Sequence, residues 1–369
     1  MTPEVIEGDG VRLRPFRPDD VADLAAGCAD PLNLRFNPGM PQPYTEADAR
    51  WWVTEGAPAA WADGGAAYAI ADRATDRLVG GAGIGQVVTP RRQAEVGYWV
   101  APWARRRGVA SDATRALADS ALRHGFDRLE LMTHAENPAS QRVALAAGFR
   151  HEGVRRSAGQ LRGGGRSDLL AWVRLADDPP GPAPRLLPDL PDGRLTDGVV
   201  TLRPLGPEDV DLMYRLHTLP EVVANQAPPV PPARSAIERR CRLAESGWLT
   251  GDIARLLILD AVTGEPAGSC GLSYTDVAAG EASLGYALLP AARGRGLATR
   301  AVRLLAGWAF GPAGVARLVA GTLPDNVASH RVLEKVGFRR EGLLRGRLPG
   351  LAGTRIDDLV FGLLPTELR

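Results

Sequence analysis

Two short stretches of the sequence combine arginine and glycine in a spacing that suits phosphate binding. Residues 103–110 read Trp-Ala-Arg-Arg-Arg-Gly-Val-Ala, and residues 291–298 read Ala-Ala-Arg-Gly-Arg-Gly-Leu-Ala, so both fit Arg-x-x-Gly-x-Ala. A glycine turn at a helix N-terminus presents unpaired N–H groups and the positive end of the helix dipole to an anion. Either these turns seat a diphosphate or they are solvated basic turns that cap a helix. The residues expected to hold the diphosphate are Arg105, Arg106, Arg107, Gly108, Val109 and Ala110, and then Arg293, Gly294, Arg295, Gly296, Leu297 and Ala298.

A second motif follows each turn at nearly the same distance. Residues 137–143 read Asn-Pro-Ala-Ser-Gln-Arg-Val, and residues 326–332 read Asn-Val-Ala-Ser-His-Arg-Val. Asparagine before proline is typical of a helix N-cap, so Asn137 and Asn326 either cap a helix or contact a ligand. Ser140 and Ser329 likewise either cap locally or take part in the chemistry.

The elements that must position these residues occur in two copies. The second copy follows the first by 188 or 189 residues, which is too long for a solenoid repeat and indicates a duplicated domain. Residues 177–198 between the copies are rich in proline and are predicted to form a semi-rigid linker. The predicted domains are therefore residues 1–176 and 199–369.

Within the first copy, strands and helices alternate. We predict an edge strand at 11–14, helical segments at 19–28 and 45–55, and strands at 67–72, 78–88 and 94–100. The turn then leads into a helix at 109–124, a strand at 129–133 and a short helix from 137. This order predicts an α/β (α+β) fold with a mixed sheet in each domain.

Composition limits the classes of function. Of 369 residues, 24% are charged and the net charge is +1, so no global field attracts nucleic acid or a membrane. The three cysteines are widely spaced, which predicts neither a disulfide framework nor a zinc site. The N-terminal residues show no signal-peptide pattern, and no apolar run is long enough to span a membrane, so we expect a cytoplasmic protein.

Taken together, the motifs resemble those of the GNAT acyltransferase superfamily. They are Gly-Tyr-Trp-Val-x-Pro, Arg-x-x-Gly-x-Ala, Asn-x-x-Ser-x-Arg-Val and Gly-Phe, and the resemblance covers nearly the whole chain twice, leaving out the linker and the termini. The nearest branch is similar to the ribosomal-protein N-terminal acetyltransferases, and the Asn-x-x-Ser motif is typical of it. The resemblance implies two GNAT-like domains, each with a mixed, mostly antiparallel central sheet flanked by helices. It also implies acetyl-CoA or another acyl-CoA as cosubstrate, and no metal.

The resemblance further implies roles for individual residues. The pantetheine arm would run along the strand end at Val100, and at Leu288 in the second copy, where the backbone N–H could polarise the thioester carbonyl. Glu95 would accept the proton of the acceptor amine. Ser140 and Ser329 would donate a hydrogen bond to the leaving thiolate. The second copy departs from this pattern because Ser283 stands in place of Glu95, so it uses Glu281 through water, uses another residue, or is not a catalyst.

Three functions remain open at this stage. The chain could acetylate the α-amine of a peptide or protein, acylate a small amine such as an antibiotic or a biosynthetic intermediate, or bind acyl-CoA as a sensor with one degenerate domain. The N-terminal copy is the preferred catalyst because it has both Glu95 and Ser140. We expect a monomer whose two domains pack as a pseudo-dimer, with a homodimer as the alternative. The acceptor and the acyl chain are not predicted.

Overall fold

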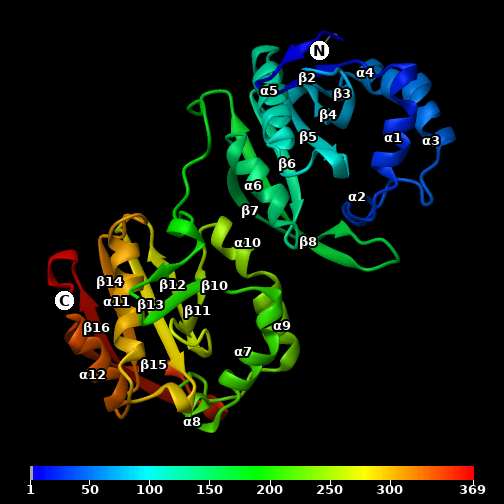
Figure 1. Cartoon of the computed structure of the whole chain (residues 1–369). Coiled ribbons are helices and arrows are strands. Elements are labelled where there is room, and N and C mark those ends of the chain that lie inside the picture. The colour runs from blue at the N-terminus through cyan, green and yellow to red at the C-terminus, as the bar shows by residue number, and fades with distance from the viewer. Residues whose placement is uncertain (1–2) are drawn as a thin grey trace. The chain divides into compact units, whose positions relative to one another are not determined.

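The computed structural model describes residues 3–369, which divide into two compact units (Figure 1). The first unit ends at Pro184 and the second begins at Arg185. This boundary falls inside the proline-rich segment 177–198. Each unit contains its own sheet and its own helices, and each is described by itself below.

In the described part of the first unit, eight strands form one sheet in the order β1-β2-β3-β4-β5-β6-β8-β7. The strands are β1 (Ile6–Glu7), β2 (Val11–Arg14), β3 (Ala66–Asp72), β4 (Leu78–Val88), β5 (Gln93–Val100), β6 (Arg128–His134), β7 (Arg150–Gln160) and β8 (Arg166–Leu175). The helices are α1 (Val21–Cys28), α2 (Pro31–Phe36), α3 (Glu46–Trp51), α4 (Ala57–Ala62), α5 (Val109–Arg123) and α6 (Pro138–Ala146). The strand predicted to lie at the edge, residues 11–14, is β2, and β1 pairs outside it.

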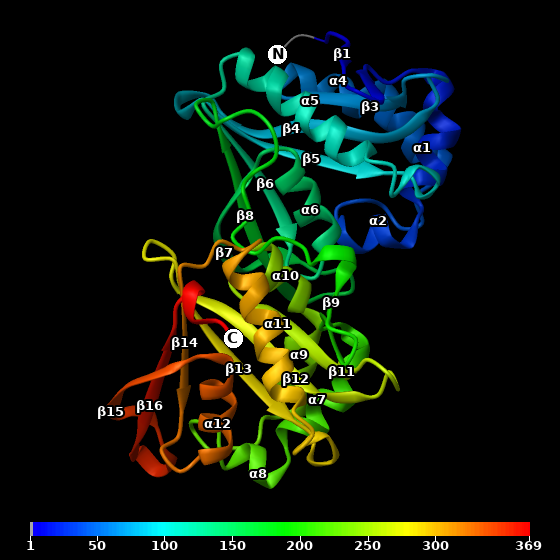
Figure 2. The ribbon, with the colours of Figure 1, turned by 60° about the vertical axis from the view of Figure 1, so that its left-hand side comes forward.

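The second unit repeats this plan with the sheet order β15-β16-β14-β13-β12-β11-β10-β9 (Figure 2). Its strands are β9 (Leu195–Thr196), β10 (Val200–Pro204), β11 (Ala254–Asp260), β12 (Pro266–Asp276), β13 (Glu281–Leu288), β14 (Arg317–Thr322), β15 (Arg339–Pro349) and β16 (Arg355–Leu363). Its helices are α7 (Val210–His217), α8 (Pro220–Val223), α9 (Arg234–Arg242), α10 (Ala244–Leu249), α11 (Leu297–Phe310) and α12 (Val327–Val336).

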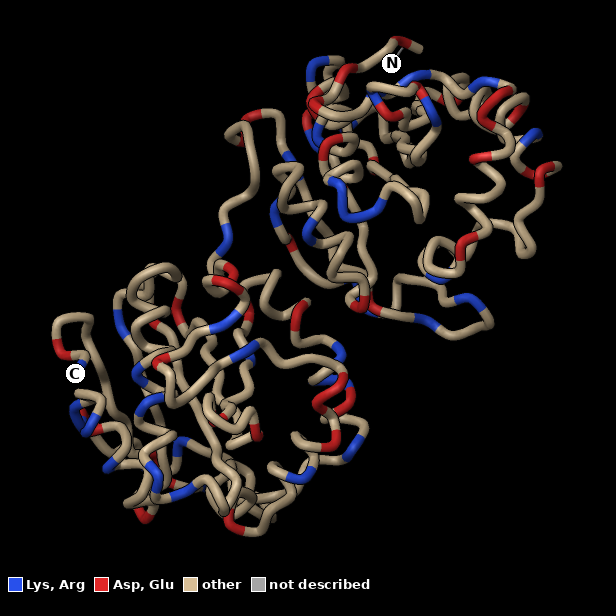
Figure 3. Tube along the Cα trace, viewed as in Figure 1, with Lys and Arg blue, Asp and Glu red and all other residues tan. Residues whose placement is uncertain are grey.

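Helices cover both faces of each sheet because each carries one apolar stripe. In α5, Val109, Ala113, Leu117 and Ala121 recur every four residues and are buried. Helix α5 packs on β2, β4 and β5, whereas α1 and α4 contact β4 and β3. In the second unit, α11 packs on β10, β12 and β13, and α7 and α10 contact β12 and β11. Acidic and basic residues alternate along the trace of each unit, with no long stretch of one sign (Figure 3).

The same kind of Arg–Asp ion pair occurs near the N-terminal end of each unit. Arg14 on β2 makes two hydrogen bonds to the carboxylate of Asp20, at 2.8 and 2.9 Å, and both side chains are buried. Arg203 on β10 pairs in the same way with Asp209, but it is more exposed. The sequence repeats Leu-Arg-Pro at 13–15 and 202–204 and Asp-Val at 20–21 and 209–210, and this ion pair gives both repeats a structural role.

Part of the proline-rich segment belongs to the core of the second unit. Leu187 and Leu190 are buried in its main apolar cluster, and the indole N–H of Trp248 donates to the carbonyl of Pro188 at 3.1 Å. On the other side of the boundary, the N–H of Ala183 donates to the carbonyl of Leu145 at 2.8 Å. The segment predicted as a linker is thus packed against the units at both ends.

Candidate active site

Both sheets open into a fork between their only parallel strands among the described residues. Strands β5 and β6 pair at Gln93 with Arg128, Ala94 with Leu129 and Glu95 with Glu130, and then separate. Strands β13 and β14 pair over the corresponding three residues, ending at Ser283 with Val319. Beyond these pairs the backbone groups of β5 and β13 that face the parallel neighbour have no ladder partner.

The backbone of Val100 faces this fork. The N–H of Ala101 donates to the carbonyl of Val79 on the β4 side at 2.9 Å, so the groups of Val100 point the opposite way by strand alternation. The carbonyl of Val100 accepts the side-chain N–H of Asn33 at 3.2 Å, which leaves its N–H directed into the fork. Leu288 has the same orientation, because the N–H of Leu289 donates to the carbonyl of Ala267 at 2.9 Å.

The glycine turns lie at the N-termini of α5 and α11, as the sequence pattern predicts. Gly108 and Gly296 adopt left-handed conformations, with φ of 78° and 76°. The first hydrogen bonds of the helices are donated by Asp112 to the carbonyl of Gly108 and by Arg300 to that of Gly296. Among the described residues, the N–H groups of 105–110 and of 294–298 therefore have no protein acceptor and can bind an anion, whereas the N–H of Arg293 donates to the carbonyl of Pro290 at 3.1 Å.

The arginines of the turns are mostly engaged by carboxylates. Arg105 pairs with Asp30, and Arg107 pairs with Asp72 at 3.2 Å. In the second unit, Arg293 pairs with Glu221 at 3.2 Å and Arg295 pairs with Asp260. Arg106 is exposed and left-handed, with φ of 59°. The donors left for an anion are therefore the backbone N–H groups and, in the first turn, the guanidinium of Arg106, which makes no ion pair with residues 3–369.

Each fork is crossed by a tyrosine–serine hydrogen bond that sequence reasoning missed. The hydroxyl of Tyr98 lies 2.7 Å from Oγ of Ser140, and that of Tyr286 lies 2.7 Å from Oγ of Ser329. Burial raises the pKa of both phenols, that of Tyr286 to about 12, so both stay protonated near neutral pH. The repeated Gly-Tyr at 97–98 and 285–286 was the available signal.

Asn137 and Asn326 act as helix caps in the structure. Each side-chain oxygen accepts the backbone N–H of the serine three residues later at 3.2 Å. This bond fixes the position of Ser140 or Ser329 at the mouth of the fork.

Glu95 and Glu130 lie side by side where the first fork closes. Glu130 is buried and saturated: its carboxylate accepts from Gln93 at 2.9 Å, from Arg128 at 3.0 Å and from Arg155 at 2.8 Å. Glu95 accepts no hydrogen bond from residues 3–369. Burial raises the pKa of Glu95 above its ordinary value, the charge of Arg155 opposes this, and that of Glu130 adds to it. A half-buried carboxylate with free lone pairs is a suitable proton acceptor.

The corresponding position in the second unit has different chemistry. Ser283 and Val319 occupy the places of the two glutamates. Glu281 is engaged, because its carboxylate accepts from Arg317 at 3.0 Å and from Thr275 at 2.9 Å. The direct counterpart of Glu95 is therefore missing, as the sequence indicates.

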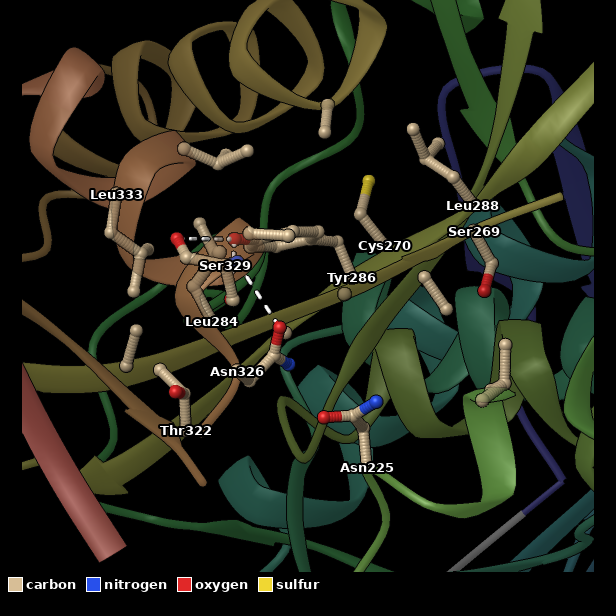
Figure 4. Close-up of a pocket in the computed structure, with 18 of the residues that line it drawn as sticks. Asn225, Ser269, Cys270, Leu284, Tyr286, Leu288, Thr322, Asn326, Ser329 and Leu333 are labelled. Carbon is tan, nitrogen blue, oxygen red and sulfur yellow. Dashed lines mark hydrogen bonds between the residues drawn. The ribbon is translucent and has the colours of Figure 1, made fainter. Parts of the chain in front are cut away.

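A pocket of about 820 Å³ joins the turn, the fork and α12 in the second unit (Figure 4). Its lining includes Gly294, Gly296, Tyr286, Ser329 and Asn326. The close-up shows the hydroxyl of Tyr286 directed at Ser329 across the cavity. This volume is within the range that holds a cofactor-sized ligand. His217 also lines this pocket, and burial lowers its pKa to about 4, so its imidazole is neutral near pH 7.

A clamp between a hairpin and the segment after α2 in the first unit was also missed by sequence reasoning. Arg162, in the β7–β8 hairpin tip, donates to the carbonyls of Leu34, Asn37 and Met40 at 2.9–3.0 Å. The hairpin thereby holds the segment that follows α2.

Among residues 3–369, no cluster of His, Cys, Asp and Glu could hold a metal ion. Over the same residues, no helix combines the length and apolar composition needed to cross a membrane.

Comparison with known proteins finds a family model and several relatives that are similar to parts of this chain. The family model described as an acetyltransferase (GNAT) domain matches twice, over residues 11–150 and 200–339. The uncharacterized N-acetyltransferase p20 of Bacillus licheniformis is 33% identical over 172 residues, which cover 46% of this chain and 94% of that protein. The ribosomal-protein-serine acetyltransferase of Escherichia coli (strain K12) is 28% identical over 103 residues, covering 28% and 57%. Among solved structures, Mycobacterium smegmatis RimJ in complex with CoA-disulfide is 27% identical, with a TM-score of 0.42, covering 47% of this chain and 86% of that chain.

Proposed function

Because this chain belongs to the acetyltransferase (GNAT) domain family and carries the domain twice, we propose that its N-terminal unit transfers an acetyl group from acetyl-CoA to a primary amine. The observation that carries the proposal is the first fork, in which β5 presents the unpaired carboxylate of Glu95 where the strands separate and the N–H of Val100 at its C-terminal end. The acceptor we favour is the α-amine of a peptide or protein. A relative named as a ribosomal-protein-serine acetyltransferase supports this choice.

The residues of the chain fit acyl-CoA. The N–H groups of the turn from Arg105 to Ala110 would hold the diphosphate, and the fork would take the pantetheine arm as an added strand. The second unit repeats this seat, and its pocket has room for such a ligand. Bound acetyl-CoA would supply the acetyl group as a thioester, whose C–S bond breaks as the new C–N bond forms.

The N-terminal unit has a candidate residue for each step of acetyl transfer. Glu95 would take a proton from the acceptor ammonium, which frees the nitrogen lone pair to attack the carbonyl carbon. The N–H of Val100 would stabilise the charge that develops on the carbonyl oxygen. Ser140, hydrogen-bonded to Tyr98, would donate to the sulfur that leaves with the electron pair of the C–S bond.

The test begins with calorimetric titration of acetyl-CoA and of CoA into the full chain. Binding is expected, and two sites per chain would mean that both turns function. Absence of binding to any acyl-CoA would refute the proposal. Gly108→Glu and Gly296→Glu, which place a bulky anion in one turn each, then assign the sites.

The second measurement is thiol release from acetyl-CoA with peptides that carry a free N-terminus, with the same peptides N-acetylated, and with small amines. We expect turnover with free N-termini that is abolished by Gly108→Glu and retained in Gly296→Glu. Turnover with small amines alone would assign a small-molecule acceptor. Acyl-CoA binding without turnover on any amine would indicate a sensor.

A further inference from the structure

We propose that the C-terminal unit binds the ammonium group of an amine acceptor through Asp358. The inference rests on the proposed function, since it places an acceptor beside the second fork. This unit has lost both carboxylates of the first fork, because Ser283 and Val319 stand where the first unit has Glu95 and Glu130. An amine acceptor there needs a carboxylate from another strand.

Asp358 on β16 is a buried carboxylate with unused capacity. Its relative exposure is 3%, and Oδ2 accepts one hydrogen bond from Arg347 at 3.0 Å. Oδ1 is buried and accepts no hydrogen bond from residues 3–369. A buried carboxylate oxygen without a donor is costly, so such an atom is expected to meet a donor supplied by a ligand. An ammonium group is a donor of matching charge.

The carboxylate has room because the neighbouring strand has a glycine. A Cβ placed on Gly321 of β14 would lie 2.6 Å from Oδ1 of Asp358, so any side chain at 321 would displace the carboxylate. The register that pairs Gly321 with Val360 puts Asp358 on the same face of the sheet as Gly321. The first unit has Met132 and Leu169 at the two corresponding positions. The glycine and the aspartate thus replace an apolar pair together.

Asp358 faces a pocket of about 500 Å³ that reaches the fork. Ser283, Gly285 and Gly321 line this pocket together with Asp358 and Arg347. Gly285 and Gly321 also line the larger pocket that contains the glycine turn, Tyr286 and Ser329. An ammonium group bound to Oδ1 would therefore lie next to Gly321, one of the residues that line both pockets.

The other charged groups of the pocket leave Oδ1 as the acceptor. Glu281 is already held by Arg317 and Thr275, so its carboxylate is satisfied. Arg347 contacts only Oδ2, and half of its side chain is exposed. Solvent therefore screens the charge of Arg347, and Oδ1 keeps lone pairs for a second donor, such as one ammonium group.

The experiment uses the full chain carrying Glu95→Gln, so that the first fork lacks its own proposed amine partner. CoA is titrated first, which tests the proposed function independently. The CoA-saturated protein is then titrated with n-butylammonium and with n-butanol, which share the alkyl chain but differ in charge. We expect n-butylammonium to bind about tenfold tighter or more, as for a charge-assisted hydrogen bond. Asp358→Asn should abolish this preference and leave CoA binding unchanged.

Two further variants serve as controls. Gly321→Met with Asp358→Leu builds the apolar pair of the first unit and should remove the preference in a folded protein that still binds CoA. Glu265→Gln changes an exposed carboxylate in the β11–β12 turn and should leave the preference intact. Equal binding of n-butylammonium and n-butanol, or a preference that survives Asp358→Asn, overturns the inference even if CoA binds. Failure to bind CoA overturns the proposed function instead.

Discussion

Replacing Glu95 by Gln should lower activity and raise stability at neutral pH. Burial raises the pKa of this carboxyl, so the folded state binds its proton more tightly than the unfolded state does. The stability associated with a raised carboxyl pKa is fully present below the unfolded pKa of about 4.3 and is lost as the pH rises through the folded pKa. At pH 7 the ionised Glu95 therefore destabilises the fold, and neutral glutamine removes this penalty. The loss of a general base costs about 10²–10⁴ in turnover, which is about 3–5 kcal/mol of barrier.

The assay follows thiol release from acetyl-CoA with an accepted amine, next to urea unfolding at pH 7 and at pH 4. We expect turnover of Glu95→Gln to fall by at least about a hundredfold, with unchanged CoA binding and higher resistance to urea at pH 7. The gain should shrink toward pH 4, where the wild-type carboxyl becomes protonated. The reasoning is refuted if turnover persists, or if turnover and stability fall together, because the second result would mean a structural role.

Five other substitutions test the fork, the glycine turn and the repeated ion pair. Tyr98→Phe and Ser140→Ala should each lower turnover about tenfold or more with CoA titration unchanged; loss of CoA binding would instead assign the pair to the cosubstrate seat. Arg106→Gly should raise the free energy of unfolding of the N-terminal unit by about 1 kcal/mol, because a left-handed backbone costs a non-glycine residue about 1–2 kcal/mol, and a decrease in urea resistance would contradict this. Asp20→Ala should cost about 1.5–3 kcal/mol, as for a hydrogen bond to a charged group, because buried Arg14 loses both bonds to Asp20 and keeps only Asp76 as an ionic partner. Asp209→Ala should cost less in the same urea experiment, since the guanidinium it leaves is 34% exposed rather than 3%, and equal losses would count against the explanation.

Much of the fold could be predicted because its signals are local. Short apolar and glycine-rich runs predict β4, β5 and β6, and the order strand, glycine turn, helix predicts α5 almost to the residue. The turn before α5 was predictable because Gly108 must adopt a left-handed conformation there. Helix α2 and strand β1 were missed, since each is too short to show a period.

Only those parts of the site that lie within a single strand or turn could be predicted from the sequence. The sequence by itself determined the duplication, the two glycine turns, and the serine at 283 in place of a glutamate. It left Asn137 and Asn326 as either helix caps or ligand contacts. The tertiary structure decided which side chains meet across strands: Glu95 with Glu130, and Asp358 with Gly321. These pairs join residues 35 and 37 positions apart, and no local pattern relates them. The physical reason is that strand register and the divergence of two parallel strands are set by the packing of the whole sheet, whereas a turn or a cap is set by the conformations of its own few residues.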